Sequence, residues 1–134
     1  MSLIFDSLPQ PKFRYSPAVR MGPFVKTAGM VGLDPQTGAL VPGGAGVEFA
    51  QILRNLQALA RDNGLALHRL MSATIYVTAF HRFAEVDAAW NEVFVAGGHL
   101  PARTAVGVSQ LPVGAQVEAD FLFYGDERDG EGRA

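Results

Sequence analysis

A lone arginine near the C-terminal end of the chain stands beside two very small residues. Residues 101–107 alternate as a β-strand does, so Arg103 shares a face with Ala105 and Gly107. A guanidinium binds a carboxylate through two parallel hydrogen bonds, which fixes the orientation of the bound acid. The segment therefore predicts a small anion pocket with Arg103 as its anchor.

Glu118 is the acidic residue expected to face Arg103. If Val108 and Val113 flank a four-residue hairpin loop, the register places Glu118 directly across from Arg103. One interpretation is an exposed salt bridge of little energetic value. The other is functional: Glu118, kept ionised by Arg103, orients a water molecule as a base or acceptor, unless it only holds Arg103 in place.

Length, composition and charge limit the class of protein. A chain of 134 residues with 49% hydrophobic content is predicted to form one domain, residues 1–124, followed by a charged, solvated tail at 125–134. The net charge of -2 and the scattered lysines and arginines give no electrostatic footprint for nucleic acid. The first residues are too short an apolar run for a signal peptide or membrane span, so we expect a cytoplasmic protein with no membrane partner.

Metal and nucleophile chemistry have little support. The chain has no cysteine, which excludes disulfides, thiolate nucleophiles and cysteine-ligated metals. His68, His81 and His99 lack the spacing of a metal site, and the serines lack a nucleophile-elbow context. We therefore expect neither a metal nor a cofactor.

The hydrophobic pattern predicts an α+β fold. Strands are expected over residues 15–21, 24–33 and 39–41, with a turn at 34–38 between the last two. Helical periodicity covers 47–63 and 83–96, and a strand at 71–78 lies between them. Two final strands complete the order βββαβαββ, a mixed sheet with two helices on one face. Because apolar residues occupy both parities of several strands, the uncovered face predicts a homo-oligomer.

Three blocks of the chain resemble the RidA/YjgF family of reactive-imine deaminases, also called the endoribonuclease L-PSP family. Its C-terminal signature is similar to residues 101–108, followed by Leu-Pro at 111–112 and Val-Glu-Ala-Asp at 117–120. Residues 14–22 and 26–38 resemble its two opening motifs, and the resemblance runs from about Tyr15 to Tyr124. It implies a chorismate-mutase-like fold, a homotrimer with clefts between subunits, and cofactor-independent hydrolysis of enamines or imines to 2-oxo acids and ammonia.

The resemblance also implies site residues beyond Arg103 and Glu118. Tyr15 matches a ligand-contacting tyrosine that would close the pocket from a neighbouring subunit, although a packed tyrosine is an open alternative. Ala28, Gly29 and Ala105 match positions that line the pocket. Trp90 has the spacing of a core residue, and in the family fold its helix borders the cleft, so Trp90 or Asn91 is a second candidate to shape the pocket.

Departures from the family pattern bear on the substrate. Ala28 stands where members usually carry serine, and Ala105 where many active members carry cysteine. The pocket is therefore expected to be drier and to suit a larger or more apolar imino acid. Two other functions remain open: an endoribonuclease or translation inhibitor, which the acidic charge opposes, and a non-catalytic trimer that binds small carboxylates, which the lost hydroxyl favours.

Overall fold

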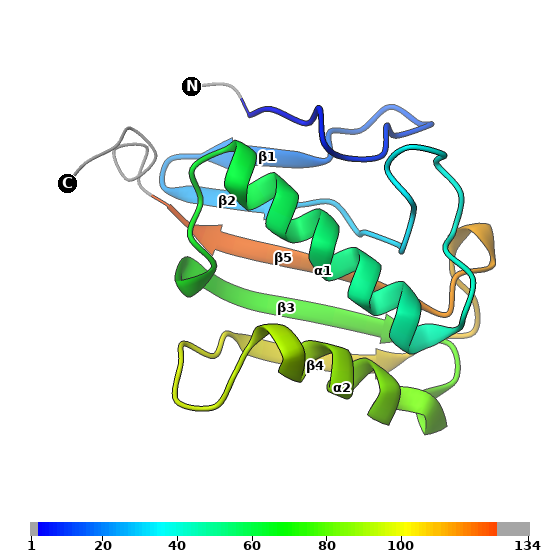
Figure 1. The fold of residues 1–134 in the computed structure, drawn as a ribbon. Helices are drawn as coiled ribbons and strands as arrows, with labels where there is room; N and C mark the ends of the chain where they lie inside the picture. Colours follow the sequence, from blue (N-terminus) through cyan, green and yellow to red (C-terminus); the bar gives the residue numbers. More distant parts are fainter. Residues whose placement is uncertain (1–2, 126–134) are drawn as a thin grey trace.

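The computed structural model describes residues 3–125, so residues 126–134 of the predicted tail lie outside the described part. Five strands and two α-helices are arranged as two layers (Figure 1). The strands are β1 (Ala18–Met21), β2 (Phe24–Thr27), β3 (Leu70–Val77), β4 (Ala102–Gly107) and β5 (Val117–Tyr124). The α-helices are α1 (Ala45–Asp62) and α2 (Phe83–Val93), and short 3₁₀ turns cover Leu67–Arg69, Phe80–Arg82 and Pro112–Gly114.

The sheet is mixed, with the strand order β1-β2-β5-β3-β4. β1, β2, β5 and β3 pair as antiparallel neighbours, whereas β4 runs parallel to β3. β3, α2 and β4 form a β–α–β unit, the usual connection that makes two consecutive strands parallel. This arrangement leaves β4 as one edge of the sheet and β1 as the other.

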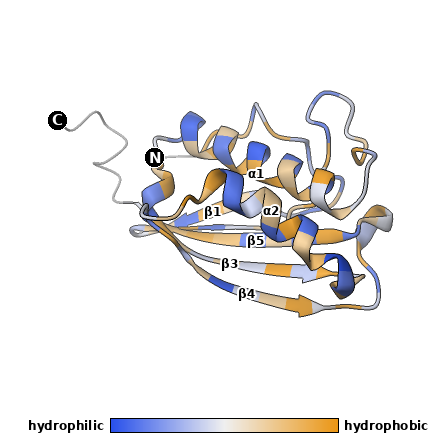
Figure 2. Ribbon diagram, turned by 60° about the horizontal axis from the view of Figure 1, so that its bottom comes forward, coloured by the Kyte–Doolittle hydropathy of each residue, from blue (hydrophilic) through white to orange (hydrophobic). Residues whose placement is uncertain are grey.

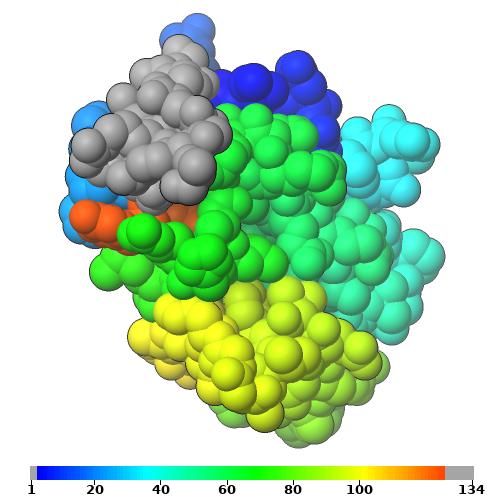
Figure 3. All heavy atoms as spheres, turned by 60° about the vertical axis from the view of Figure 1, so that its left-hand side comes forward, coloured from blue at the N-terminus to red at the C-terminus, as the bar shows by residue number. Residues whose placement is uncertain are grey.

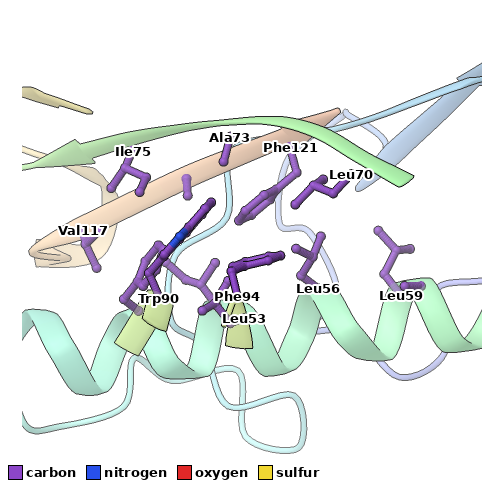
Figure 4. Close-up of a cluster of buried hydrophobic side chains, with 14 of the residues drawn as sticks. Leu53, Leu56, Leu59, Leu70, Ala73, Ile75, Trp90, Phe94, Val117 and Phe121 are labelled. Atoms are coloured by element: carbon purple, nitrogen blue, oxygen red, sulfur yellow. The ribbon is translucent and has the colours of Figure 1, made fainter. Parts of the chain in front are cut away.

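A hydrophobic core fills the space between the sheet and the helices. Leu53, Leu56 and Leu59 from α1, Trp90 from α2 and Phe94 just after α2 point toward the side chains of β3 and β5 (Figure 4). The facing strand residues are Leu70, Ala73, Ile75, Val117 and Phe121, all nearly inaccessible to solvent. Burial of this one face selects the strand register, because a shift by one residue would expose every one of these side chains.

Both helices lie on the same side of the sheet, as the sequence predicts, and no other described element covers the opposite side (Figure 2). We call the opposite side the open face. Register and burial place on it Val19, Met21, Phe24, Lys26, Ser72, Thr74, Tyr76, Thr104, Val106, Glu118, Asp120, Leu122 and Tyr124. Several of these are large apolar residues with substantial exposure, and Met21 is 72% exposed.

The strand expected at residues 39–41 does not form, and the strand expected at 24–33 is shorter than predicted; only isolated bridges follow β2. β2 ends at Thr27, and the chain pairs with β5 again only at Met30, through two hydrogen bonds with Ala119. The predicted turn at 34–38 forms, with Gly38 at φ 74°, and Leu33 then meets Leu40 in a single bridge. Residues 39–41 are therefore not a strand of the sheet, because the short return from the turn pairs only with the chain that leads into it.

The predicted hairpin between the last two strands is wrong. β3 lies between β4 and β5, so the register pairs Arg103 with Ala73 and Glu118 with Tyr76. A tight hairpin needs a loop of two to five residues, whereas residues 108–116 form a longer connection that crosses the end of β3. The β–α–β unit places β4 on one side of β3, and β5 pairs with the other side of β3 instead of with the free edge of β4.

α1 carries more buried polar residues than its sequence pattern predicts. The helical periodicity of residues 47–63 places Glu48, Gln51 and Asn55 mainly on the polar side of the helix, yet each is nearly buried. The Asn55 side-chain amide donates to the carbonyl of Leu33, in the segment between β2 and α1, and Gln51 donates to Asn55. Glu48 instead accepts the N–H of Gln116, just before β5. On its other flank α1 packs beside α2, whose segment forms the yellow surface next to the green one in Figure 3.

Within residues 3–125, neither α-helix combines the length and the hydropathy that a membrane crossing requires.

Candidate functional site

Arg103 extends from the edge strand β4 toward α2. It lies on the helix side of the sheet together with Ala105 and Gly107, as strand alternation predicts. Its Nη1 donates to Oδ1 of Asp87 at 2.8 Å. The side chain keeps 28% of its surface exposed, so the guanidinium sits at the edge of the fold rather than inside it.

Two aromatic rings of α2 support the guanidinium. Its Cζ lies 5.3 Å from the centre of the Phe83 ring and 5.0 Å from the centre of the Trp90 ring. Cation–π contacts of this kind hold a guanidinium against the rings and leave its donor edge to bind anions. Trp90 is also part of the core, 6% exposed and packed 4.3 Å from Phe94 between ring centres, which confirms the prediction that it is a core residue. Its role in shaping a ligand pocket stays a prediction.

Asp87 is a candidate site residue that the analysis of the sequence does not predict. Phe83, Asp87 and Trp90 are spaced by four and then three residues, which places them on one face of α2. That spacing, an acid between two aromatics on a helix expected to border the cleft, is the signal that would have found it.

The small residues next to Arg103 have different neighbours. Ala105 is partly buried and packs against the core. A Cβ added to Gly107 would come within 3.8 Å of the Phe80 ring, which stacks in turn on Phe83 at 5.2 Å between ring centres. Arg103 is therefore surrounded by aromatic side chains and the carboxylate of Asp87, and not by the empty pocket that the sequence predicts.

Glu118 lies on the open face, against Gly29. A Cβ on Gly29 would overlap Oε2 of Glu118, so only glycine leaves room for this carboxylate. The Met30–Ala119 bridge holds the two segments in that register. Of the predicted site residues, Gly29 and Glu118 are thus brought together.

A second carboxylate, Asp120, follows Glu118 on the same face. The Tyr76 hydroxyl donates to Oδ2 of Asp120 at 3.1 Å, and Nζ of Lys26 lies 3.3 Å from its Oδ1. Burial raises the pKa of Glu118, and the neighbouring charge of Asp120 raises it further. The predicted pairing of Glu118 with Arg103 of the same chain is therefore wrong, because that Arg103 is on the other side of the sheet and Asp120 is the charge nearby within the chain.

Tyr15, Ala28 and Gly29 come together around a cavity of about 90 Å³. The cavity lies beside α1, and Leu8, Pro11 and Leu59 contribute to its apolar wall. Ala28 donates its N–H to the carbonyl of Pro17, which ties the segment after β2 to the stretch before β1. Tyr15 remains half exposed, so its ring is available at the surface.

The predicted site residues form two groups in one chain. Arg103, Trp90 and Ala105 lie on the helix side, near the β4 edge. The second group lies on the other side of β3, on and beside β5, and consists of Glu118, Gly29, Ala28 and Tyr15. The structure does not join these groups within a single chain.

Among the histidines, His99 bonds to the backbone rather than to a predicted site residue. His99 Nε2 bonds to the carbonyl oxygen of Leu70 at 2.7 Å. No three histidine, aspartate or glutamate side chains within residues 3–125 converge as a metal site would require.

Comparisons with known proteins agree on one family. The family model described as Endoribonuclease L-PSP matches residues 5–123. A mouse (Mus musculus) protein named 2-iminobutanoate/2-iminopropanoate deaminase is 36% identical over 81% of this chain and 78% of its own length. A RutC family protein of Pyrococcus abyssi is 31% identical over 89% of this chain and 92% of its own.

Solved structures show the same fold. The crystal structure of RidA from an Antarctic Psychrobacter matches with a TM-score of 0.84 and 28% identity, covering 92% of this chain and 98% of that one. The match includes the mixed five-stranded sheet and its two helices. The chain therefore belongs to the RidA/YjgF family, also described as endoribonuclease L-PSP.

Proposed function

We propose that this chain is a cofactor-independent deaminase that hydrolyses reactive 2-imino acids to 2-oxo acids and ammonia. The observation that carries the proposal is the separation of Arg103 and Glu118 on opposite faces of one sheet. β4 is an edge strand, so Arg103 is accessible to the open face of another chain. Two neighbouring chains of a homotrimer then supply one complete cleft.

The open face supports association of chains. Met21, Phe24, Val106 and Tyr124 are 72%, 42%, 39% and 39% exposed, which is unusual for large side chains on one sheet face. Covering this face with copies of itself would remove the apolar surface from water. A closed ring of chains would also produce one equivalent cleft per chain.

Arg103 is the anchor of the substrate carboxylate. The rings of Phe83 and Trp90 fix the guanidinium before the ligand arrives, so little side-chain entropy is lost on binding. A hydrogen-bonded pair that involves a charge contributes about 1.5–3 kcal/mol, which corresponds to roughly tenfold to a hundredfold in affinity.

Glu118 is the acid–base group in this proposal. Hydrolysis adds the oxygen of water to the imine carbon, passes both protons of that water to the nitrogen in turn, and breaks the C–N bond as the C=O double bond forms, with release of ammonia. A carboxyl group whose pKa is raised by burial and by Asp120 can accept the proton of water and return it to nitrogen. The name of the mouse relative, an iminobutanoate deaminase, supports this reaction class.

The test is ammonia release from freshly generated 2-iminobutyrate above the uncatalysed rate, with wild type, Arg103→Ala and Arg103→Lys compared. Arg103→Lys keeps the charge and loses the planar fork, so both variants should lose most of the activity while the fold remains. Full activity in Arg103→Ala would overturn the assignment of this cleft. RNA cleavage without ammonia release would favour the endoribonuclease alternative, and ligand binding without either would favour a carboxylate-binding trimer.

A further inference from the structure

The anchor guanidinium already has an anionic partner in its own chain. Asp87 accepts a hydrogen bond from Nη1 of Arg103 at 2.8 Å. Within residues 3–125, Asp87 is the one carboxylate that pairs with Arg103. Asp87 keeps 42% of its side-chain surface exposed, so it faces the same solvent edge as the guanidinium.

This pair changes the charge that a ligand meets. An arginine has five N–H donors, and one bond to Asp87 leaves others for a ligand carboxylate. The summed charge of Arg103 and Asp87, however, is zero. A ligand carboxylate on the guanidinium therefore lies beside a second carboxylate and is repelled by it.

The repulsion depends on what else the ligand carries. A 2-oxo acid has a carboxylate and no cation, so nothing compensates its proximity to Asp87. A protonated 2-imino acid or an α-amino acid carries a positive nitrogen one bond away from the carbon that bears the carboxylate. Its carboxylate pairs with Arg103 while its nitrogen pairs with Asp87, and all four charges are then matched.

We propose that Asp87 is a specificity-determining residue that makes the Arg103 site select zwitterions, namely protonated 2-imino acids and α-amino acids, over 2-oxo acids. The inference rests on the proposed function for the identity of the reacting ligand. Stabilising the iminium nitrogen favours the more electrophilic form of the C=N carbon. After water adds and ammonia leaves, the 2-oxo acid has lost its cation, so Asp87 favours product release.

A purely structural role for Asp87 makes a different prediction. If Asp87 only holds Arg103 in place, an amide oxygen of the same size serves almost as well, and both ligand classes respond alike. Asp87→Asn keeps the shape and the acceptor and removes only the charge. Glu85→Gln is the matched control, because Glu85 lies on the same helix and pairs with Arg82 at 2.8 Å instead of with Arg103.

The experiment measures the dissociation constants of 2-aminobutyrate and 2-oxobutyrate by titration calorimetry, for wild type, Asp87→Asn and Glu85→Gln at one pH and ionic strength. We expect wild type to prefer 2-aminobutyrate. In Asp87→Asn, 2-oxobutyrate should bind about three- to tenfold more tightly and 2-aminobutyrate about three- to tenfold more weakly, the scale of partly exposed charge pairs. Glu85→Gln should leave the ratio of the two constants unchanged.

Several outcomes would overturn the inference. They are equal shifts for both ligands in Asp87→Asn, a wild-type preference for 2-oxobutyrate, and a lack of binding by either ligand to wild type. The wild-type preference needs no variant, so the inference stays testable even if Asp87→Asn folds poorly. Failure of the proposed function is a separate result, because the chain could show the expected binding ratio and release no ammonia from an imine.

Discussion

Arg103 and Glu118 project from opposite faces of the same sheet, with β3 between their strands. Arg103 is held on the helix side by Asp87 and by the rings of Phe83 and Trp90. Glu118 rests on the open face against Gly29. No rotation of either side chain brings the two together within one chain, since the sheet itself separates them.

Complementation between inactive variants is the first expected consequence. If a cleft takes Arg103 from one chain and Glu118 from its neighbour, a mixture of Arg103→Ala and Glu118→Gln chains rebuilds some wild-type clefts. With random mixing after denaturation and refolding, about a quarter of the clefts contain both native residues, so about a quarter of wild-type ammonia release should return.

Each variant refolded alone is the control, and it should stay inactive. A mixture that remains at the level of the separate variants would show that both residues act from the same chain or that one of them is not needed.

The second prediction concerns the close approach of Gly29 to Glu118. Gly29→Ala places a Cβ where Oε2 of Glu118 lies, and the flexible carboxylate has to move while the backbone remains. Displacement of an acid–base group by about 1 Å lowers turnover by about tenfold to a hundredfold. Steady-state ammonia release together with a thermal melt measures both effects, and we expect a melting temperature close to that of wild type.

Gly98→Ala is the matched control, because a Cβ there meets only ordinary contacts with Val95. Unchanged turnover in Gly29→Ala would contradict the proposed role of the Glu118 carboxylate.

The two α-helices and β3 could be predicted from the sequence because their signals are local. α1 and α2 follow the apolar spacing of the core residues that they bury, such as Leu56 and Val86, and β3 follows the alternation of Ala73, Ile75 and Val77. The side of the sheet on which Arg103 lies follows from the same alternation. These features depend on residues that are neighbours in the sequence.

The position of β5 could not be read from the same local pattern. β5 could form a hairpin with β4 or pair with β3. Which of the two forms depends on how β3, α2 and β4 pack together, and this packing involves contacts between segments that are distant in the sequence. The ion pair of Arg103 with Asp87 joins β4 to α2, and the burial of Glu48 needs cover from residues far along the chain. For the same reason, the prediction from sequence paired Glu118 with an arginine that lies on the other side of the sheet in the same chain.

Glu48 supplies the third prediction. Its Oε1 accepts the N–H of Gln116 at 2.8 Å, just before β5, and the side chain is 2% exposed. Burial raises the pKa of Glu48, and hydrogen bonds from Gln116 and Val117 offset part of that effect. Glu48→Ala leaves a buried donor unpaired, so unfolding in urea should show a loss of about 1–3 kcal/mol.

Glu48→Gln keeps the acceptor and the volume, and it should lose less stability than Glu48→Ala. Glu92→Ala, at an exposed site on α2, sets the scale of an ordinary surface change, about 0.5 kcal/mol or less. A stability of Glu48→Ala equal to that of Glu92→Ala would mean that the bond to Gln116 is replaced by water.

The last prediction follows from the raised pKa of Glu118. A carboxyl group whose pKa is higher in the folded than in the unfolded chain binds its proton more tightly when folded. Its contribution to stability is therefore present below its ordinary value of 4.5 and is lost as the pH rises through the raised folded value. Glu118→Gln removes this titration, so the free energy of unfolding of Glu118→Gln should increase relative to that of wild type as the pH rises above 4.5. Urea unfolding at several pH values, at one protein concentration, measures the difference in free energy of unfolding between Glu118→Gln and wild type.

Asp120→Asn is the control, because it removes only the second cause of the pKa shift. In that background the difference made by Glu118→Gln should become smaller but not vanish, because burial of Glu118 remains. If the difference in free energy of unfolding between Glu118→Gln and wild type does not change with pH, Glu118 titrates as a solvated carboxyl. The acid–base role proposed for Glu118 would then lose its physical basis.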